Sequence, residues 1–115
     1  MDLGYFFKEA IDRQASDLHL IEGSVPAIRI NGELVRLGDK PVPYGELKYA
    51  IYSILDSTTQ ERFNRRRDLD LSWEFFNSRF RVNLHFQEGR IGLAARLVTE
   101  KIPRPDQILF NETIY

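Results

Sequence analysis

The stretch Asp68–Leu97, DLDLSWEFFNSRFRVNLHFQEGRIGLAARL, decides the fold because apolar and polar residues alternate along three successive runs within it. The apolar members of the alternation are Leu69, Leu71, Trp73, Phe75, Phe80, Val82, Leu84, Phe86, Ile91, Leu93, Ala95 and Leu97. A period of two residues is typical of a β-strand with one buried face. Asn77-Ser78 and Glu88-Gly89 separate the runs, so the stretch predicts a three-stranded antiparallel meander with one apolar face.

Towards the N-terminus, the sequence predicts a helix, a short strand and a hairpin. Apolar residues recur at helical spacing over the first dozen or so residues, so we expect an amphipathic helix that ends near Gln14. The short apolar run ASDLHL, residues 15–20, follows it. Asn31-Gly32 then lies between apolar runs at 27–30 and 33–37. Because both central residues of a type I′ turn need positive φ, Asn-Gly is the strongest short signal for a hairpin.

Two more helices are expected between this hairpin and the meander. Apolar residues recur at helical spacing over residues 47–55, and Ser57-Thr58-Thr59-Gln60 fits a capping box that starts a third helix. Basic residues gather at the end of that helix: Arg62, Arg65, Arg66 and Arg67. A solvated helix end explains them, because the helix dipole favours cations there, and a phosphate or nucleic-acid patch is the alternative. Together the elements predict an α+β domain, an antiparallel sheet packed by about three helices.

Composition limits the classes of function. The chain has 115 residues, which suits one domain with a real core. Its net charge of −1 removes the general electrostatic argument for nucleic acid as a partner. The sequence contains no cysteine, so it has no disulfides or thiolate metal sites. No apolar run approaches the roughly 20 residues that a membrane span needs, and we expect a cytosolic protein.

An opposed pair of arginines is the main candidate for chemistry. If both meander turns are two-residue loops, counting outward from them places Arg81 opposite Arg96, Glu74 opposite Arg81 and Asp70 opposite His85. Like charges that face each other across a ladder are destabilising, so the arginines need a compensating anion. Two interpretations stay open: Glu74 supplies that charge in a structural ladder on the surface, or the arginines bind an external anion.

Other candidate sites are weaker. Ser16, Asp17 and His19 are residue types of a nucleophilic triad, but neighbours on an extended segment alternate faces and are not expected to converge. His19 and His85 lack the close spacing of metal ligands, so no metal site is expected. No GxxxxGK[ST] phosphate loop occurs, so we expect no catalytic residue in this chain.

A series of short motifs resembles the N-terminal domain of the PilT-like twitching-motility ATPases, in the type II and IV secretion ATPase superfamily. The order and the intervals match along nearly the whole chain. The motifs are Ala15-Ser16-Asp17-Leu18-His19-Leu20, Gly23, Pro26, Ile28-Arg29-Ile30-Asn31-Gly32, Leu34, Asp68-Leu69-Asp70-Leu71-Ser72, Arg79-Phe80-Arg81-Val82-Asn83, Gln87, Gly89 and Ala94-Ala95-Arg96-Leu97-Val98.

The resemblance implies a fold and a context. It implies a PAS-like domain over residues 1–99 and a linker over residues 100–115, leading to a RecA-like ATPase domain that this chain lacks. Residues 108–112 resemble the segment just before that domain, so the chain is expected to be a fragment. The implied parent is a homo-hexameric ATPase, cytoplasmic and peripheral to the bacterial inner membrane. It would draw pilin subunits back into that membrane, with the pilus inner-membrane platform as its partner.

The resemblance also implies roles for particular residues. Arg81 and Arg96 match arginines that reach nucleotide phosphates held by the RecA-like domain of the same or a neighbouring subunit. Asp17 and His19 would support the strand and the packing against a neighbouring subunit. ATP and Mg would belong to the intact protein, with no tightly bound cofactor and no ATPase activity in this chain alone. The alternatives are the same domain of a pilus-assembly or type II secretion ATPase, or a free-standing PAS-like module for a ligand or partner.

Overall fold

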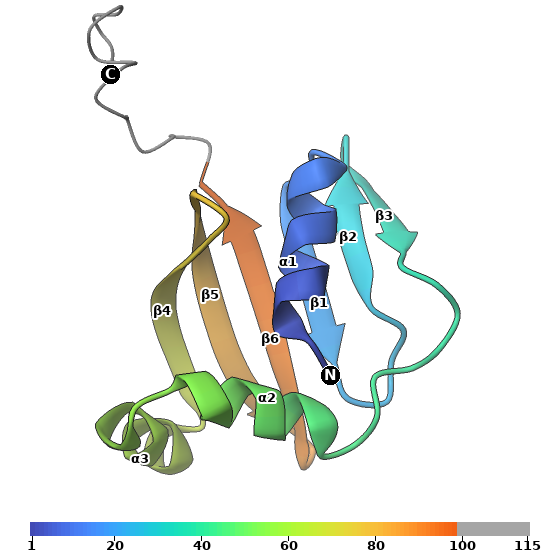
Figure 1. Ribbon diagram of the computed structural model, residues 1–115. Helices are drawn as coiled ribbons and strands as arrows, with labels where there is room; N and C mark the ends of the chain where they lie inside the picture. Colours follow the sequence, from blue (N-terminus) through green and yellow to red (C-terminus); the bar gives the residue numbers. More distant parts are fainter. Residues whose placement is uncertain (99–115) are drawn as a thin grey trace, which may run out of the picture.

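The computed structural model describes residues 1–98. The expected linker, residues 100–115, and the last residue of the expected domain lie outside the described residues. Six strands form one antiparallel sheet in the order β3-β2-β1-β6-β5-β4 (Figure 1). The strands are β1 Asp17–Ile21, β2 Ala27–Ile30, β3 Glu33–Arg36, β4 Asp68–Phe75, β5 Ser78–Gln87 and β6 Arg90–Leu97. The expected α+β class and the C-terminal meander, β4 to β6, are therefore confirmed.

The N-terminal hairpin and the meander join at the centre of the sheet. β1 pairs antiparallel with β6 along its whole length, with Leu18 opposite Ala95 and Leu20 opposite Leu93. Both alternating patterns turn these apolar side chains towards the same face, where all four are buried. The two segments thus bury one continuous apolar surface although most of the chain separates them in sequence.

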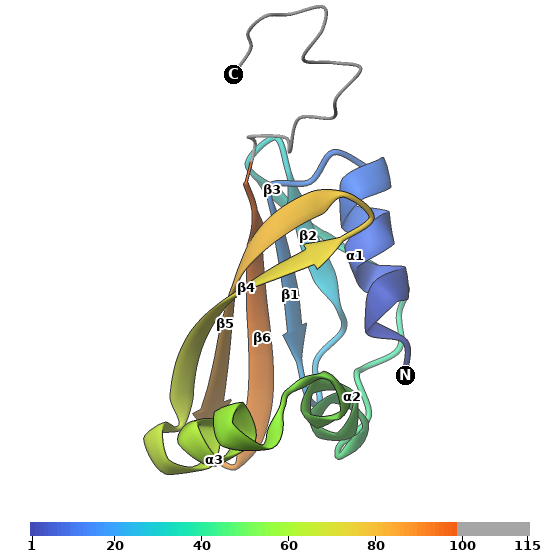
Figure 2. The same cartoon turned by 60° about the vertical axis from the view of Figure 1, so that its left-hand side comes forward.

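Three helices supply the other half of the core. They are α1 Leu3–Asp12, α2 Glu46–Ile54 and α3 Ser57–Arg66, close to the expected ranges. α1 lies against the middle of the sheet, and α2 and α3 cross its lower end (Figures 1 and 2). Phe7 of α1 is fully buried and stacks on Phe75 with ring centroids 4.2 Å apart. The helices pack on one face of the sheet (Figure 2). The apolar residues of the alternation are buried or half-buried under them, so the polar residues lie on the opposite face.

Two of the hairpin turns have the expected form. Asn31 and Gly32 have φ of 49° and 83°, and Glu88 and Gly89 have φ of 53° and 79°. Ile30 pairs with Glu33 and Gln87 pairs with Arg90, so each turn is a two-residue loop with positive φ at both positions. The β5–β6 turn therefore fixes the register on which the arginine argument depends.

The β4–β5 turn lies one residue earlier than expected. Its central residues are Phe76 and Asn77, with φ of 52° and 63°, while Ser78 already pairs with Phe75 in the ladder. A bulky residue is unfavourable at positive φ, which is why residue type alone favours Asn77-Ser78. Phe76 is 57% exposed, and its ring lies beside α1, with Lys8 Nζ 5.7 Å from its centroid.

The start of α3 also differs in detail. Asp56, not Ser57, is the N-cap, and its Oδ1 accepts a hydrogen bond of 2.7 Å from the Thr59 amide. Gln60 donates instead to the carbonyl oxygens of Tyr52 and Leu55, which closes the end of α2. At the other end, the guanidinium of Arg67 lies 4.1 Å from the centre of the Phe86 ring. None of the helices within residues 1–98 has the length and apolarity needed to cross a bilayer.

Candidate anion site on the open face of the sheet

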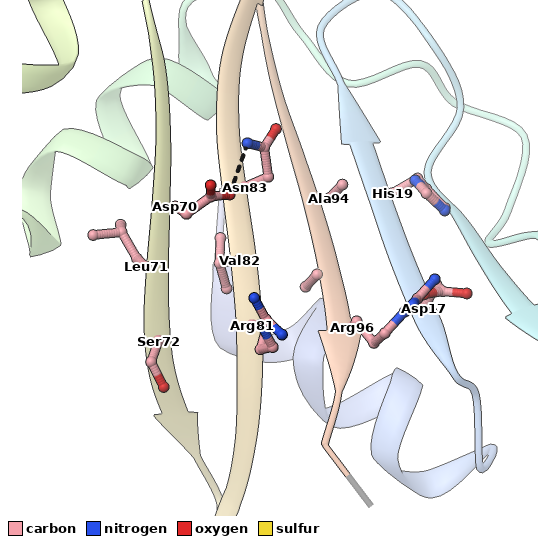
Figure 3. A pocket seen from close by; sticks show the side chains of 11 residues that line it. Asp17, His19, Asp70, Leu71, Ser72, Arg81, Val82, Asn83, Ala94 and Arg96 are labelled. Carbon is pink, nitrogen blue, oxygen red and sulfur yellow. Dashed lines mark hydrogen bonds and ion pairs between the residues drawn. The ribbon is translucent and has the colours of Figure 1, made fainter. Parts of the chain in front are cut away.

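An open hollow lies on the face of the sheet that the helices leave uncovered (Figure 3). Its volume is about 690 Å³, and strands β1, β4, β5 and β6 form its floor. The polar side chains that line it are Asp17, His19, Asp70, Ser72, Arg81, Asn83 and Arg96. Asp17 and His19 come from the N-terminal segment and the others from the meander, so the β1–β6 pairing creates the hollow.

One row of side chains crosses the sheet through the basic half of the hollow. Backbone pairing places Arg29 opposite Asp17, Asp17 opposite Arg96, Arg96 opposite Arg81, and Arg81 opposite Ser72. The expected opposition of Arg81 and Arg96 is therefore confirmed. The row carries three guanidinium groups and one carboxylate, an arrangement that favours an anion.

Two of the cross-strand pairs that the sequence predicted between β4 and β5 are wrong. Glu74 lies opposite Arg79 and not opposite Arg81, and Asp70 lies opposite Asn83 while Asp68 lies opposite His85. Moving the turn by one residue shifts every cross-strand partner by two, which keeps each side chain on its face but changes its neighbour. Glu74 therefore does not compensate the arginine pair directly.

Asp17 supplies the negative charge that one of the two interpretations assigned to Glu74. Its Oδ1 accepts a hydrogen bond of 3.1 Å from Arg96 Nε, and its Oδ2 lies 3.5 Å from Arg29 Nε. Ser16 Oγ donates to the same Oδ2 at 3.0 Å, so the hydroxyl of Ser16 contacts the carboxylate despite the alternation of the chain. Within residues 1–98 no ion pair includes Arg81. Arg81 is thus the guanidinium in the row that makes no ion pair with a carboxylate of the described residues.

The pKa of Asp17 lies below its ordinary value. Burial of the side chain by itself raises the pKa, because it disfavours the charged form. The hydrogen bonds from Arg96 and Ser16 and the positive charge of Arg96 act in the opposite direction and outweigh the burial. The carboxylate therefore stays ionised, and Asp17 holds its arginine partners across the neutral pH range.

Asp70 and Asn83 line the acidic half of the hollow, and Asp68 and His85 lie in the next row outside it. Asn83 Nδ2 donates to Asp70 at 3.0 Å and to Asp68 at 2.8 Å, and Asn83 Oδ1 lies 3.0 Å from His85 Nδ1. The His85 ring lies over Gly92 of β6, since a Cβ added to Gly92 would come within 2.8 Å of His85 Cε1. Asp70 and His85 thus meet through Asn83 rather than directly.

His19 is half-buried between two small side chains, with Ala27 and Ala94 as its cross-strand partners. The small neighbours leave the imidazole accessible from the hollow (Figure 3). Across residues 1–98 no group of three or more histidine and acidic side chains is arranged to hold a metal ion. Like Asp17, His19 lines the hollow.

Sequence reasoning missed one arginine of the row and one buried carboxylate that lies outside the hollow. The sequence assigned Arg29 to a strand but predicted no partner for its side chain. Arg29 Nε lies 3.5 Å from Asp17 Oδ2, and Arg29 Nη1 donates to the Gly32 carbonyl at 3.0 Å. Glu22 is 5% exposed, and its carboxylate accepts from the Gly45 and Ile91 amides. Arg29 interrupts an apolar strand and Glu22 follows one, and a charge at such a position is the signal that could have identified them.

Comparisons with known proteins give a consistent result. No family model matches the chain. The type IV pilus retraction ATPase PilT of Pseudomonas aeruginosa is 28% identical over 113 residues, which are 97% of this chain and 33% of that protein. The type IV pilus ATPase PilU of the same organism is 17% identical over 115 residues, which are 99% of this chain and 30% of PilU.

Solved structures agree with these relatives. The pilus retraction motor PilT with bound ADP matches with a TM-score of 0.78 and 29% identity, over 95% of this chain and 34% of that one. The ATPase DotB of Legionella pneumophila matches with a TM-score of 0.70 and 24% identity, over 90% of this chain and 32% of that one. The chain spans about a third of the length of the relatives it matches. These similarities show that the chain is homologous to the N-terminal region of PilT, and the likeness to DotB shows a shared fold.

Proposed function

We propose that this chain, a homologue of the N-terminal domain of PilT-like secretion ATPases, is the regulatory and assembly domain of a motor that powers pilus retraction. In the intact protein it acts beside a RecA-like ATPase domain of the same or a neighbouring subunit, in a homo-hexamer. The motor works on the cytoplasmic side of the inner membrane, against the pilus platform. Its output is retraction of the pilus and twitching motility.

The observation that carries this proposal is the opposed pair Arg81 and Arg96 on the open face of the sheet. Asp17 lies beside Arg96, while Arg81 has no acidic ion-pair partner within residues 1–98. Phosphate oxygens match such a pair, because guanidinium groups bind phosphate with paired, charge-assisted hydrogen bonds. The similarity to a PilT structure with bound ADP supports a nucleotide as the source of the phosphate.

The role that we assign to the two arginines is electrostatic. A phosphoryl group in transfer spreads negative charge over its oxygens, and positioned guanidinium groups stabilise that charge. ATP and Mg²⁺ bind mainly to the RecA-like domain, and Arg81 and Arg96 complete the site from outside it. The isolated chain then has negligible turnover and weak affinity for ATP.

The test is ATP hydrolysis by the full-length protein, once the downstream sequence has been checked for a GxxxxGK[ST] loop. We expect Arg81→Ala and Arg96→Ala each to slow hydrolysis by roughly a hundred- to a thousandfold, the range found when one donor to developing charge is removed. Arg79→Ala is the matched control, because Arg79 lies on the same strand and face but opposite Glu74 and outside the hollow. Hydrolysis rates that match the wild type in both hollow variants would overturn the site assignment.

A further inference from the structure

We infer that Asp17 is a positioning residue for Arg96: its carboxylate holds the Nε edge of the guanidinium and so prepares Arg96 for a phosphate group. The inference rests on the proposed function, because it names how one of the two arginines is set for its ligand. It also gives a role in the hollow to Ser16 and Asp17 of the run ASDLHL, residues 15–20, which we call the N-terminal box.

The contrast in exposure between the two partners supports this role. The Arg96 side chain is 75% exposed, whereas the Asp17 side chain is 12% exposed. A long exposed side chain samples many rotamers, and a ligand that binds it must restrict them at a cost in free energy. A contact with a nearly buried carboxylate restricts Arg96 before the ligand arrives, which lowers that cost.

The atoms used in the contact leave Arg96 able to bind an anion. The hydrogen bond to Asp17 Oδ1 comes from Nε, which carries one of the five N–H donors of the guanidinium. The four donors on the two Nη atoms are outside this bond. A phosphate can therefore take paired hydrogen bonds from Arg96 while Asp17 keeps its own. Figure 3 shows the Arg96 side chain extending from β6 towards Asp17 on β1.

Asp17 is itself fixed from the other side. Its second oxygen, Oδ2, accepts from Ser16 Oγ at 3.0 Å and lies 3.5 Å from Arg29 Nε. Arg29 in turn donates to the carbonyl of Gly32 in the β2–β3 turn. Arg96 is thus linked through Asp17 and Arg29 to the two-residue turn between β2 and β3.

If Asp17 positions Arg96, removing its carboxylate has the opposite effect on anion binding from the one expected if Asp17 acts through its charge alone. Asp17 carries a negative charge beside the proposed phosphate site, so its charge alone repels an anion, and removing it would strengthen binding. If Asp17 acts by ordering Arg96, removing the carboxylate weakens binding instead. The sign of the effect therefore separates the two explanations.

The experiment is an NMR titration of the whole 115-residue chain with inorganic tripolyphosphate, followed through the Nε–Hε signals of the arginines. We expect Asp17→Asn and Asp17→Glu each to weaken binding by roughly three- to tenfold, the equivalent of losing the ordering of one long side chain. Asp17→Glu keeps the charge but moves the carboxylate, so it isolates position from charge. In an Arg96→Ala background, Asp17→Asn should cause no further loss.

Asp12→Asn is the matched control, because Asp12 pairs with Lys8 on α1 and the substitution makes the same change of charge away from the hollow. Unchanged or tighter binding in Asp17→Asn, with weaker binding in Arg96→Ala, would overturn the positioning role and leave the proposed function intact. Equal binding by wild type, Arg81→Ala and Arg96→Ala would overturn the proposed function itself.

A measurement on the unsubstituted chain covers the case in which an Asp17 variant does not fold. The ¹⁵N relaxation of the arginine Nε atoms should show Arg96 more ordered than Arg65, which lies in the exposed last turn of α3. If Arg96 Nε is as mobile as Arg65 Nε, Asp17 does not hold it, and the inference is wrong.

Discussion

Asp17 joins parts of the chain that lie far apart in sequence. Its partner Arg96 is 79 residues away, and Arg29 approaches it from the opposite neighbouring strand. The Asp17 carboxylate lies between the guanidinium groups of Arg29 and Arg96. Its attraction to Arg96 stabilises the β1–β6 pairing, and it offsets the repulsion between the two positive charges in the row. The Asp of the N-terminal box is thus a structural link as well as a neighbour of the candidate site.

This link predicts a dependence of stability on pH. The pKa of Asp17 is lower in the folded chain than its ordinary value of 3.8, so the ionised carboxylate stabilises the fold above that pH. The contribution is lost as the pH falls through the folded value. Asp17→Asn should lower the free energy of unfolding by about 1 kcal/mol near pH 6, and this difference should shrink near pH 3.

Urea denaturation of the two proteins at both pH values measures this difference. The control is Asp12→Asn, whose exposed i,i+4 pair with Lys8 should contribute only a few tenths of a kcal/mol. A difference between wild type and Asp17→Asn that grows as the pH falls would contradict the assigned direction of the pKa shift.

For individual residues, local sequence signals were sufficient to predict one side-chain pair of the hollow but not the other contacts. The opposition of Arg81 and Arg96 follows from counting outward from Glu88-Gly89, a turn that residue types identify correctly. The partner of Glu74 depends on the other turn and was missed. The contact between Asp17 and Arg96 depends on which strands pair across most of the chain, and no local pattern determines that.

Among the elements, the β4–β5 turn departs from what local residue preference predicts. Phe76 adopts positive φ with its ring beside α1, so the turn consists of Phe76-Asn77 and Ser78 belongs to β5. Alternation, helical spacing and Asn-Gly were enough to predict the other strands, the three helices and the first hairpin. The exact cap of α3 was not predictable, because Asp56 and Ser57 are both good capping residues.

The turn assignment can be tested by substitution. Asn77→Gly should leave stability equal or slightly higher, since glycine accepts a φ of 63° at no steric cost. Asn77→Ala should lower the free energy of unfolding by about 1 kcal/mol, because alanine resists that conformation. Thermal or urea unfolding gives both values.

The matched control is Ser78→Gly, which places glycine in a paired strand position and should destabilise the chain. If the turn were instead Asn77-Ser78, glycine at position 78 would be neutral or stabilising. That result would restore the pairing of Glu74 with Arg81.

Across the whole molecule, the hollow depends on the way two halves of the sheet meet. The meander contributes Arg81 and Arg96, the N-terminal segment contributes Asp17 and His19, and β1–β6 pairing aligns them. The three helices of residues 1–98 cover one face of the sheet (Figure 2). The polar side chains that line the hollow lie on the other face. A domain built in this way can present arginines to a ligand that is held mainly by another domain.

The most direct test of the central claim is to map where inorganic tripolyphosphate binds on the 115-residue chain by NMR. The account predicts saturable shifts of the Arg81 and Arg96 Nε–Hε signals and of backbone amides around them in β5 and β6. The basic end of α3, with Arg65 and Arg66, should respond little, because the helix C-terminus explains its charge. Saturable shifts confined to α3, with none at Arg81 and Arg96, would contradict the account.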